Sequence, residues 1–151
     1  MWFKRDLRFT DHAPLYAAQQ QSLPILLLYC FEPSVMNYDD SDVRHWRFVY
    51  QSLQDMQSKL GKLNVQLYIF HEEVITVFQK FAETYTITTI FSHQETGNKI
   101  TYDRDMAVQQ FCKEHAIDWK EYQNNGVIRK LKSRKNWEQR WKQKMQETSK
   151  I

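Results

Sequence analysis

The amino-acid sequence predicts an α/β domain built on an open, parallel sheet. Short runs rich in β-branched and aromatic residues alternate along the chain with longer segments whose apolar residues recur every three or four positions. A chain of 151 residues is long enough to form one hydrophobic core. Strands that alternate with helices pack as a parallel sheet, and the connecting helices cover its two faces.

Five apolar runs are predicted to be the strands. Most of them are almost continuously apolar, which is typical of strands buried on both faces of a parallel sheet. The runs are residues 1–3, 24–31, 65–70, 87–91 and 117–122. The sequence therefore predicts a Rossmann-like open five-stranded parallel sheet with helices on both faces, followed by a basic helical tail.

The first two connecting helices have recognisable ends. Asp11 is predicted to cap a helix that carries Pro14 in its first turn and Leu15 on its buried side. Ser41 is predicted to cap a long helix that Gly61 ends. One face of the long helix carries apolar side chains at spacings of three and four, namely Trp46, Val49, Leu53, Met56 and Leu60.

Two more helices are predicted over residues 72–83 and 101–114. The first has an apolar face of Val74, Val77, Phe78 and Phe81, and the second has one of Tyr102, Met106, Phe111 and Cys112. The stretch "HEE" at 71–73 contains residue types that bind metals, but acidic residues are favoured at a helix N-terminus. We interpret these acids as capping the helix that follows.

Ligands of open parallel sheets bind beyond the carboxyl ends of the strands. The candidate site therefore lies in the loops over residues 4–10, 30–37 and 92–99. The last of these loops is polar, and its residue types fit either a ligand site or a plain loop. Three histidines near element boundaries are predicted to be solvent-facing: His71, His93 and His115.

The basic character of the chain is confined to its end. The net charge is +3, but residues 129–151 hold nine Lys or Arg against two acids, which gives +7. The remaining residues hold 12 basic against 16 acidic side chains, which gives −4. Charge therefore gives no support for nucleic-acid binding by the main body. In the tail, Trp137, Trp141 and Met145 are four apart and share one helix face.

Composition excludes several other classes. With three glycines, the chain has neither a Walker loop nor a GxGxxG dinucleotide turn. No apolar run approaches the roughly 18 residues of a membrane span, so no membrane partner is expected. Cys30 and Cys112 are far apart and lack metal-type spacing, and there is no apolar leader. We expect free thiols and a cytoplasmic location.

Several motifs, in order along the whole chain, resemble the DNA photolyase and cryptochrome family. The opening "WFKRDLRFTDHAPL" is similar to the first strand and loop of that family's N-terminal α/β domain. The other matching stretches are "FEPSV", "FVYQSLQDM", "HQETGNKITYDRDMAVQQFC" and "NGVIRKLKSRKNWEQRWKQKM". The agreement of independent motifs makes the resemblance specific, whereas "RDLR" alone would be weak.

The resemblance implies a flavoprotein of two parts. Residues 1–128 correspond to the α/β domain, which holds a light-harvesting antenna pigment in some members. Residues 129–151 correspond to a basic linker that leads to a helical domain, absent from this sequence, that binds FAD and damaged DNA. In photolyases, which are carbon–carbon lyases, light drives an electron from the FAD to split a cyclobutane pyrimidine dimer. A cryptochrome-like blue-light photoreceptor is the alternative.

The same resemblance implies which residues bind the antenna pigment. They lie in the three predicted loops and are Arg5, Asp6, Arg8, Cys30, Phe31, Gln94, Glu95, Asn98 and Lys99. Asp6 would accept a hydrogen bond from a ring N–H, and Arg5 or Lys99 would meet a phosphate or carboxylate. The structural alternative is that Asp6 and Arg8 pair locally and brace the end of the sheet.

Two departures from the family pattern bear on this prediction. Folate-binding members carry an Asn-Glu pair where this chain has Ile100 and Thr101. This departure counts against a folate and leaves a deazaflavin, a flavin, a lumazine or an empty pocket. The first strand is also short, which suggests a clipped start. A stand-alone nucleotide-binding protein of the universal-stress type is a further alternative, although the shortage of glycines at a phosphate-binding turn counts against it.

Overall fold

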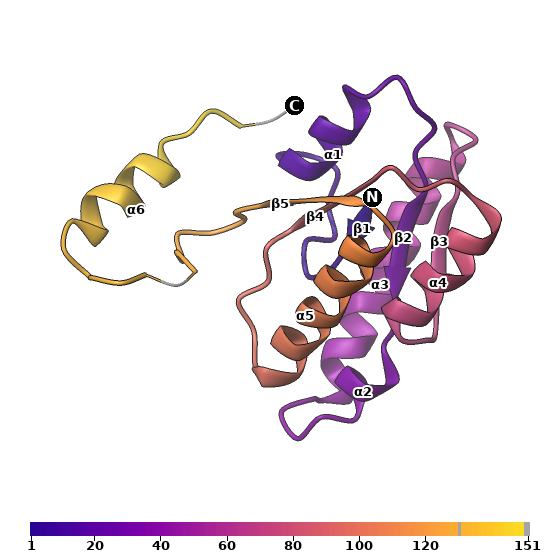
Figure 1. The fold of residues 1–151 in the computed structure, drawn as a ribbon, viewed down its shortest axis with the longest axis horizontal. Coiled ribbons are helices and arrows are strands. Elements are labelled where there is room, and N and C mark those ends of the chain that lie inside the picture. Colours follow the sequence, from indigo (N-terminus) through magenta and orange to yellow (C-terminus); the bar gives the residue numbers. More distant parts are fainter. Residues whose placement is uncertain (130, 150–151) are drawn as a thin grey trace.

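The computed structural model describes residues 1–129 and 131–149, and it has the predicted alternation of strands and helices (Figure 1). The strands are β1 (Trp2–Phe3), β2 (Leu27–Cys30), β3 (Leu67–Phe70), β4 (Thr89–His93) and β5 (Asp118–Tyr122). The helices are α1 (Ala13–Gln19), α2 (Pro33–Met36), α3 (Val43–Gly61), α4 (Val74–Thr84), α5 (Lys99–Glu114) and α6 (Trp137–Met145). Within the described residues no helix is long and apolar enough to cross a membrane.

All strand pairs are parallel, as predicted, but hydrogen bonds do not join the five strands into one continuous sheet. One sheet has the order β1-β2-β3, and β4 pairs with β5 in a second. Strand β1 pairs with β2 through Trp2 opposite Leu28 and Phe3 opposite Tyr29. It also lies beside β4, but forms no strand pairing with it. The five predicted strands are thus present, and their hydrogen-bonded pairing gives a sheet of three strands and a sheet of two rather than one sheet of five.

Helices cover both faces, as predicted. Trp2 and Leu28 point into a core formed with α4 and α5, whereas Phe3 and Tyr29 point into a second core formed with α1 and α3. Successive side chains of a strand point to opposite faces, so β1 and β2 contribute to both cores. The two central strands are thereby buried on both sides.

Two helix caps lie one residue beyond their predicted positions. The Leu15 N–H donates to His12 Nδ1 at 3.2 Å, so His12 rather than Asp11 caps α1. The Arg44 N–H donates to Asp42 Oδ1 at 2.8 Å, so Asp42 caps α3. Ser41 instead accepts a hydrogen bond from Trp46 Nε1 at 2.6 Å, which occupies its hydroxyl.

The starts of α4 and α5 also differ from prediction. Glu73 occupies the predicted N-cap position of α4, but its side chain makes no cap hydrogen bond; it accepts from Ser34 instead, and the Val74 N–H faces Glu32 Oε2 at 3.5 Å. Helix α5 begins two residues earlier than predicted, at Lys99, with Asn98 as its cap.

The buried face of α5 was predicted incorrectly in part. Tyr102 and Met106 are exposed, and the buried side chains are Thr101, Asp105, Val108, Phe111 and Cys112. The apolar pattern could not include Thr101 and Asp105, because they are polar residues whose burial depends on hydrogen-bonding partners. The buried Asp105 pairs with Lys4 and Arg104.

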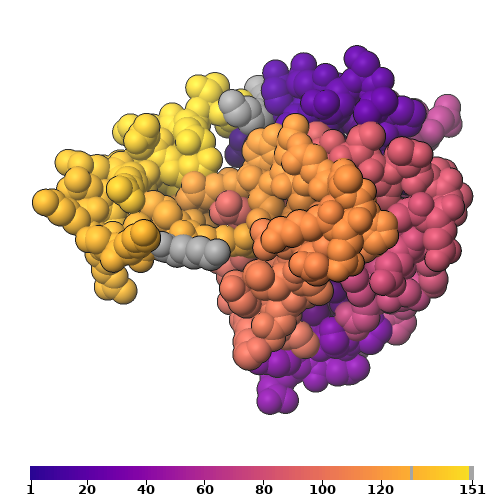
Figure 2. Space-filling view, viewed as in Figure 1, coloured from indigo at the N-terminus to yellow at the C-terminus, as the bar shows by residue number. Residues whose placement is uncertain are grey.

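The tail extends away from the main body (Figures 1 and 2). In α6, the rings of Trp137 and Trp141 stack with centroids 6.5 Å apart, and both side chains are more than a third exposed. Trp141 lies against Gly126, where a Cβ atom would come within 2.1 Å of the indole. Of the predicted tail over 129–151, residues 130, 150 and 151 lie outside the described residues.

Candidate ligand-binding cleft

A cleft of about 580 Å³ opens at the carboxyl ends of β1 and β2. Its charged side chains come from the loop after β1, from the end of β2 and from the region where α5 begins. Its apolar wall comes largely from β2, α2 and α3. The lining residues are Trp2, Phe3, Lys4, Arg5, Leu7, Arg8, Tyr29, Cys30, Glu32, Val35, Asp40, Ser41, His45, Trp46, Phe48, Val49, Ser52, Glu95, Asn98 and Arg104.

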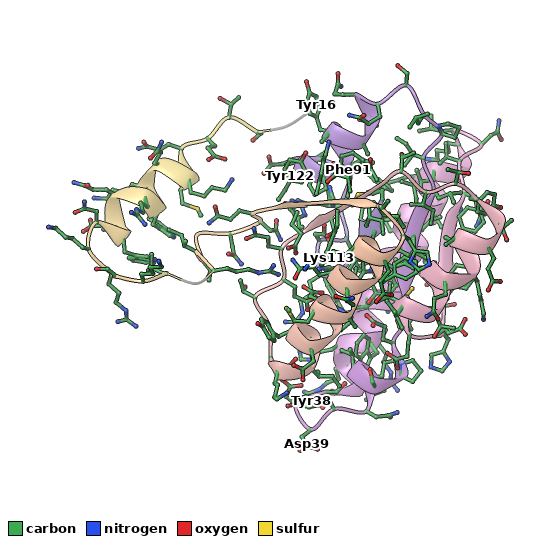
Figure 3. The ribbon with its side chains drawn as sticks, viewed as in Figure 1. Tyr16, Tyr38, Asp39, Phe91, Lys113 and Tyr122 are labelled. Atoms are coloured by element: carbon green, nitrogen blue, oxygen red, sulfur yellow. The ribbon has the colours of Figure 1, made fainter. Side chains whose placement is uncertain are left out.

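A second cavity of about 480 Å³, here called the amino-end groove, lies where β1, β2 and β4 begin. Its lining is mainly apolar, with Leu23, Ile25, Phe81 and Ile87 among it, and includes no charged side chain. Figure 3 shows the two ends of the molecule, with Tyr16 of α1 at one end and Tyr38 and Asp39, in the loop after α2, at the other. A polar heteroaromatic ligand needs fixed donors and acceptors, so the charged cleft is the better candidate site.

Buried charges organise the floor of the cleft. The Arg104 guanidinium pairs with Glu32 at 2.9 Å, with Asp105 at 2.9 Å and with Glu95. Burial acts to lower the pKa of Arg104, but the three surrounding carboxylates outweigh this effect and raise the pKa above its ordinary value. Burial raises the pKa of Glu32 to about 6 despite its pairing with Arg104. Glu32 therefore faces the cleft as a buried carboxyl group whose pKa is raised by burial and lowered by Arg104.

Lys4 is the most deeply buried cation of the cleft. Its ammonium lies 3.0 Å from Asp105 Oδ2 and 4.3 Å from the centre of the Trp2 ring, and its side chain is 3% exposed. Arg104 lies over the same ring at 4.9 Å, so the indole contacts two cations. Burial lowers the pKa of Lys4, and the Asp105 carboxylate opposes that effect. The Asp105 carboxylate therefore favours the charged form of the lysine.

Aromatic rings form one wall of the cleft. Trp46 and Tyr29 line it, and Phe31 packs between them, with ring centroids 6.1 Å from Trp46 and 5.1 Å from Tyr29. Phe48 also lines the cleft and is 70% exposed. A flat ring system entering the cleft would find apolar surface on this side and charged groups on the other.

Five of the nine sequence-predicted site residues line this cleft: Arg5, Arg8, Cys30, Glu95 and Asn98. Arg5 lies at the mouth, with a 66% exposed side chain paired to Glu95 at 2.9 Å. Arg8 donates to Asn124 Oδ1 at 2.9 Å. Asn98 caps α5 and also donates to Asp40. Burial raises the pKa of the Cys30 thiol, which keeps it protonated.

The other four predicted residues do not line the cleft. Phe31 stands behind the aromatic wall, and Lys99 is exposed and pairs with Asp103. Gln94 donates its backbone N–H to the Tyr122 carbonyl at 2.7 Å, which extends the pairing of β4 with β5. Asp6 is buried beneath the cleft, and its carboxylate does not pair with the Arg8 side chain, so the local pairing of those two residues is also corrected.

Asp6 instead pairs with two buried histidines. Its Oδ2 atom lies 2.7 Å from His12 Nε2 and 2.5 Å from His93 Nδ1, and its Oδ1 atom accepts the Lys4 backbone N–H at 2.7 Å. Burial acts to raise the pKa of Asp6, but its contacts with His12 and His93 outweigh it and hold the pKa below its ordinary value. The prediction that His93 faces solvent is therefore wrong, because its side chain is buried and only 3% exposed.

This trio is the only group of metal-ligand type within residues 1–129 and 131–149. The α1 cap argues against a metal there, because His12 Nδ1 already accepts the Leu15 N–H. A neutral imidazole that accepts at one nitrogen carries its proton on the other, so the Nε2–H group faces the Asp6 carboxylate at 2.7 Å, without hydrogen-bond geometry, and is not a free metal ligand. The trio is a structural brace between the first loop and the end of β4.

The brace predicts an acid-sensitive stability contribution. Burial lowers the pKa of His93 below its ordinary value of 6.5, so the folded state favours the neutral ring. The contribution of His93 to the free energy of unfolding is complete above pH 6.5 and is lost at lower pH, as the unfolded chain takes up the proton. The difference in the free energy of unfolding between wild type and His93→Gln should therefore shrink from about pH 8 to about pH 5, measured by urea denaturation. A difference that grows on acidification would contradict this account.

Together, these features define an open parallel α/β domain with a charged cleft at the carboxyl ends of its strands. Residues 1–147 match the sequence profile of the family described as DNA photolyase. The chain belongs to the DNA photolyase family.

Two curated relatives are cryptochromes. Cryptochrome-2 of Gallus gallus is 26% identical over 117 residues, which cover 78% of this chain and 20% of that protein. Cryptochrome DASH of Synechocystis sp. is 29% identical over 115 residues, which cover 72% of this chain and 24% of that protein. The chain thus spans about a fifth to a quarter of the length of these relatives.

A solved structure has the same fold. It is an archaeal photolyase from Sulfolobus tokodaii, described as containing two FAD molecules with the implication of a novel light-harvesting cofactor. The match has a TM-score of 0.78 at 20% sequence identity and covers 99% of this chain and 35% of that one. The comparison shows the α/β fold, which makes up about a third of that longer chain.

Proposed function

We propose that this chain is the N-terminal antenna domain of a light-dependent DNA repair flavoprotein, and that its carboxyl-end cleft holds a flat heteroaromatic pigment. The observation that carries the proposal is the cleft itself, in which an aromatic wall faces buried charges. Its volume of about 580 Å³ falls within the roughly 300–1,000 Å³ of small-molecule sites. A pigment bound there would pass excitation energy to a flavin without transferring an electron.

The residues suggest how a flavin-type pigment would be held. The ring system would lie along Trp46 and Tyr29, and a carboxyl oxygen of the buried Glu32 would accept a ring N–H in the role that the family resemblance implies for Asp6. Arg5 at the mouth would meet a phosphate. The archaeal photolyase with two FAD molecules favours a flavin among deazaflavin, flavin and lumazine.

The remaining functions are proposed for the whole protein. We infer that a C-terminal helical domain binds FAD and damaged DNA and splits cyclobutane pyrimidine dimers, and that residues 129–151 lead to it. The stacked, half-exposed Trp137 and Trp141 supply an apolar face for that domain to cover. The buried free thiols Cys30 and Cys112 accord with a cytoplasmic location.

A cryptochrome-like photoreceptor is a second candidate, because the cryptochromes of Gallus gallus and Synechocystis sp. are among the relatives. The two candidates share the α/β domain and differ in the output of the flavin domain. Light-dependent loss of thymine dimers by the full-length protein would support the photolyase, whereas bound flavin without repair would support the photoreceptor. Family membership leaves the universal-stress-type alternative without support.

Riboflavin 5′-phosphate (FMN) is a suitable probe of the cleft. We expect it to bind the chain with one-to-one stoichiometry, and Arg5→Gln to weaken binding about tenfold, because a charge-assisted contact to the phosphate is lost. Lys99→Gln, which removes an equal charge outside the cleft, should leave the affinity within about twofold. The measurement is a titration followed by flavin fluorescence. Equal effects of the two substitutions would contradict the placement of the phosphate.

A further inference from the structure

The segment that follows β5 lies against the loops that form the cleft. We call residues 123–129 the linker root. Asn124 Oδ1 accepts a hydrogen bond from Arg8 Nη2 at 2.9 Å, and Asn125 Nδ2 donates to Thr96 Oγ1 at 3.3 Å. Both contacts join the linker root to loops at the carboxyl end of the strands, one after β1 and one after β4.

Arg129 makes the strongest of these attachments. Its guanidinium donates to both oxygens of Glu121 at 3.0 Å, to Asp105 Oδ2 at 3.3 Å and to the backbone carbonyl of Glu95 at 2.5 Å. The side chain is 30% exposed, so these contacts are partly shielded from water. A guanidinium presents several donors in a fixed planar arrangement, which lets one residue fasten β5, α5 and the loop after β4 together.

Two of the residues that Arg129 contacts are tied to the cleft. The Glu95 carboxylate, 6% exposed, pairs with Arg5 and Arg104 inside the cleft, while the Glu95 backbone carbonyl accepts from Arg129 outside it. Asp105 pairs with Lys4 and Arg104 on the cleft side and with Arg129 on the other. The position of Glu95 is therefore determined from both sides.

We propose that Arg129 is a positioning residue for the cleft, and that ligand binding in the cleft is coupled to the docking of the linker root. The inference rests on the proposed pigment site. If docking of the linker root holds Glu95 and Arg8 in their binding positions, then a bound ligand must in turn favour docking, because coupling between two sites is reciprocal. Pigment occupancy would then influence the segment that leads toward the second domain.

The test compares Arg129→Gln with Arg134→Gln. Arg134 is an exposed arginine of the same linker, so its substitution removes the same charge without touching the cleft loops. FMN affinity of the 151-residue chain should fall at least about fivefold in Arg129→Gln, the lower limit of typical coupling, and stay within about twofold in Arg134→Gln. Hydrogen exchange at the backbone amides of residues 123–129 should slow when FMN binds to the wild type, and slow less in Arg129→Gln.

A second variant guards against loss of folding. Asn124 is exposed, so Asn124→Ala removes the contact with Arg8 at little risk to the core, and it should weaken FMN binding in the same direction. Unchanged FMN affinity in both Arg129→Gln and Asn124→Ala, with no change in exchange on binding, would overturn the coupling and leave the pigment site standing. Failure of the wild type to bind FMN would overturn the flavin site and the coupling that rests on it.

Discussion

Replacing Asp105 with alanine is expected to destabilise the domain by about 3–5 kcal/mol, the typical loss when one partner of a buried ion pair is removed. Asp105 accepts from Lys4, Arg104 and Arg129, and the first of these cations is almost fully buried. Without the carboxylate, the nearest acid to Lys4 in the part of the chain that the structure describes is Glu121 at 3.9 Å. The measurement is urea denaturation followed by circular dichroism.

The pairing of Asp105 with three cations predicts that variants of Lys4 and Asp105 lose different amounts of stability. Lys4→Met should cost less than Asp105→Ala, since Asp105 would keep Arg104 and Arg129 as partners. Adding Lys4→Met to Asp105→Ala should recover part of the loss, because the uncompensated buried cation is then removed. Additive losses in the double variant would show that Lys4 and Asp105 do not depend on each other.

Substitution of Asp6 with asparagine should also be costly, at about 1–3 kcal/mol for each buried donor that is left without an acceptor. The carboxylate faces His12, His93 and the Lys4 backbone, and an amide group would direct donors toward a site already occupied by donors. Thermal and urea unfolding would measure the loss.

Asp39→Asn is the matched control for Asp6→Asn. Asp39 is exposed in the loop after α2 (Figure 3), and its substitution should change stability by no more than about 0.5 kcal/mol. A loss of less than about 1 kcal/mol for Asp6→Asn would mean that the two histidines do not depend on the carboxylate.

The sequence pattern predicted the strands well because their apolar runs are local features. It failed where the outcome depended on side-chain hydrogen bonds, local or distant, which an apolar pattern does not report. Thr101 and Asp105 interrupt the apolar periodicity of α5, and their burial follows from contacts with Asn98 and with Lys4. The two caps were displaced by one residue because Asp11 and His12, like Ser41 and Asp42, are adjacent residues that can both accept from a helix N-terminus.

The candidate site was predictable in position but not in every residue. Topology indicated the carboxyl end of the sheet, where the charged cleft lies, since ligands of such folds bind beyond the carboxyl ends of the strands. Glu32 was missed although it lies within "FEPSV", directly after Cys30 and Phe31, which were both singled out. The pairing of Asp6 with His93 joins residues 87 positions apart, and no local pattern reports such a contact.

The most direct test of the central claim is the FMN titration repeated with one variant at each end of the sheet. Val35→Trp places a large side chain in the carboxyl-end cleft, and Leu23→Trp places one in the amino-end groove. We predict one-to-one binding to the wild type, a loss of at least about tenfold in Val35→Trp, and unchanged affinity in Leu23→Trp. Absence of saturable binding, or a loss in Leu23→Trp rather than in Val35→Trp, would contradict the assignment of the carboxyl-end cleft as the pigment site.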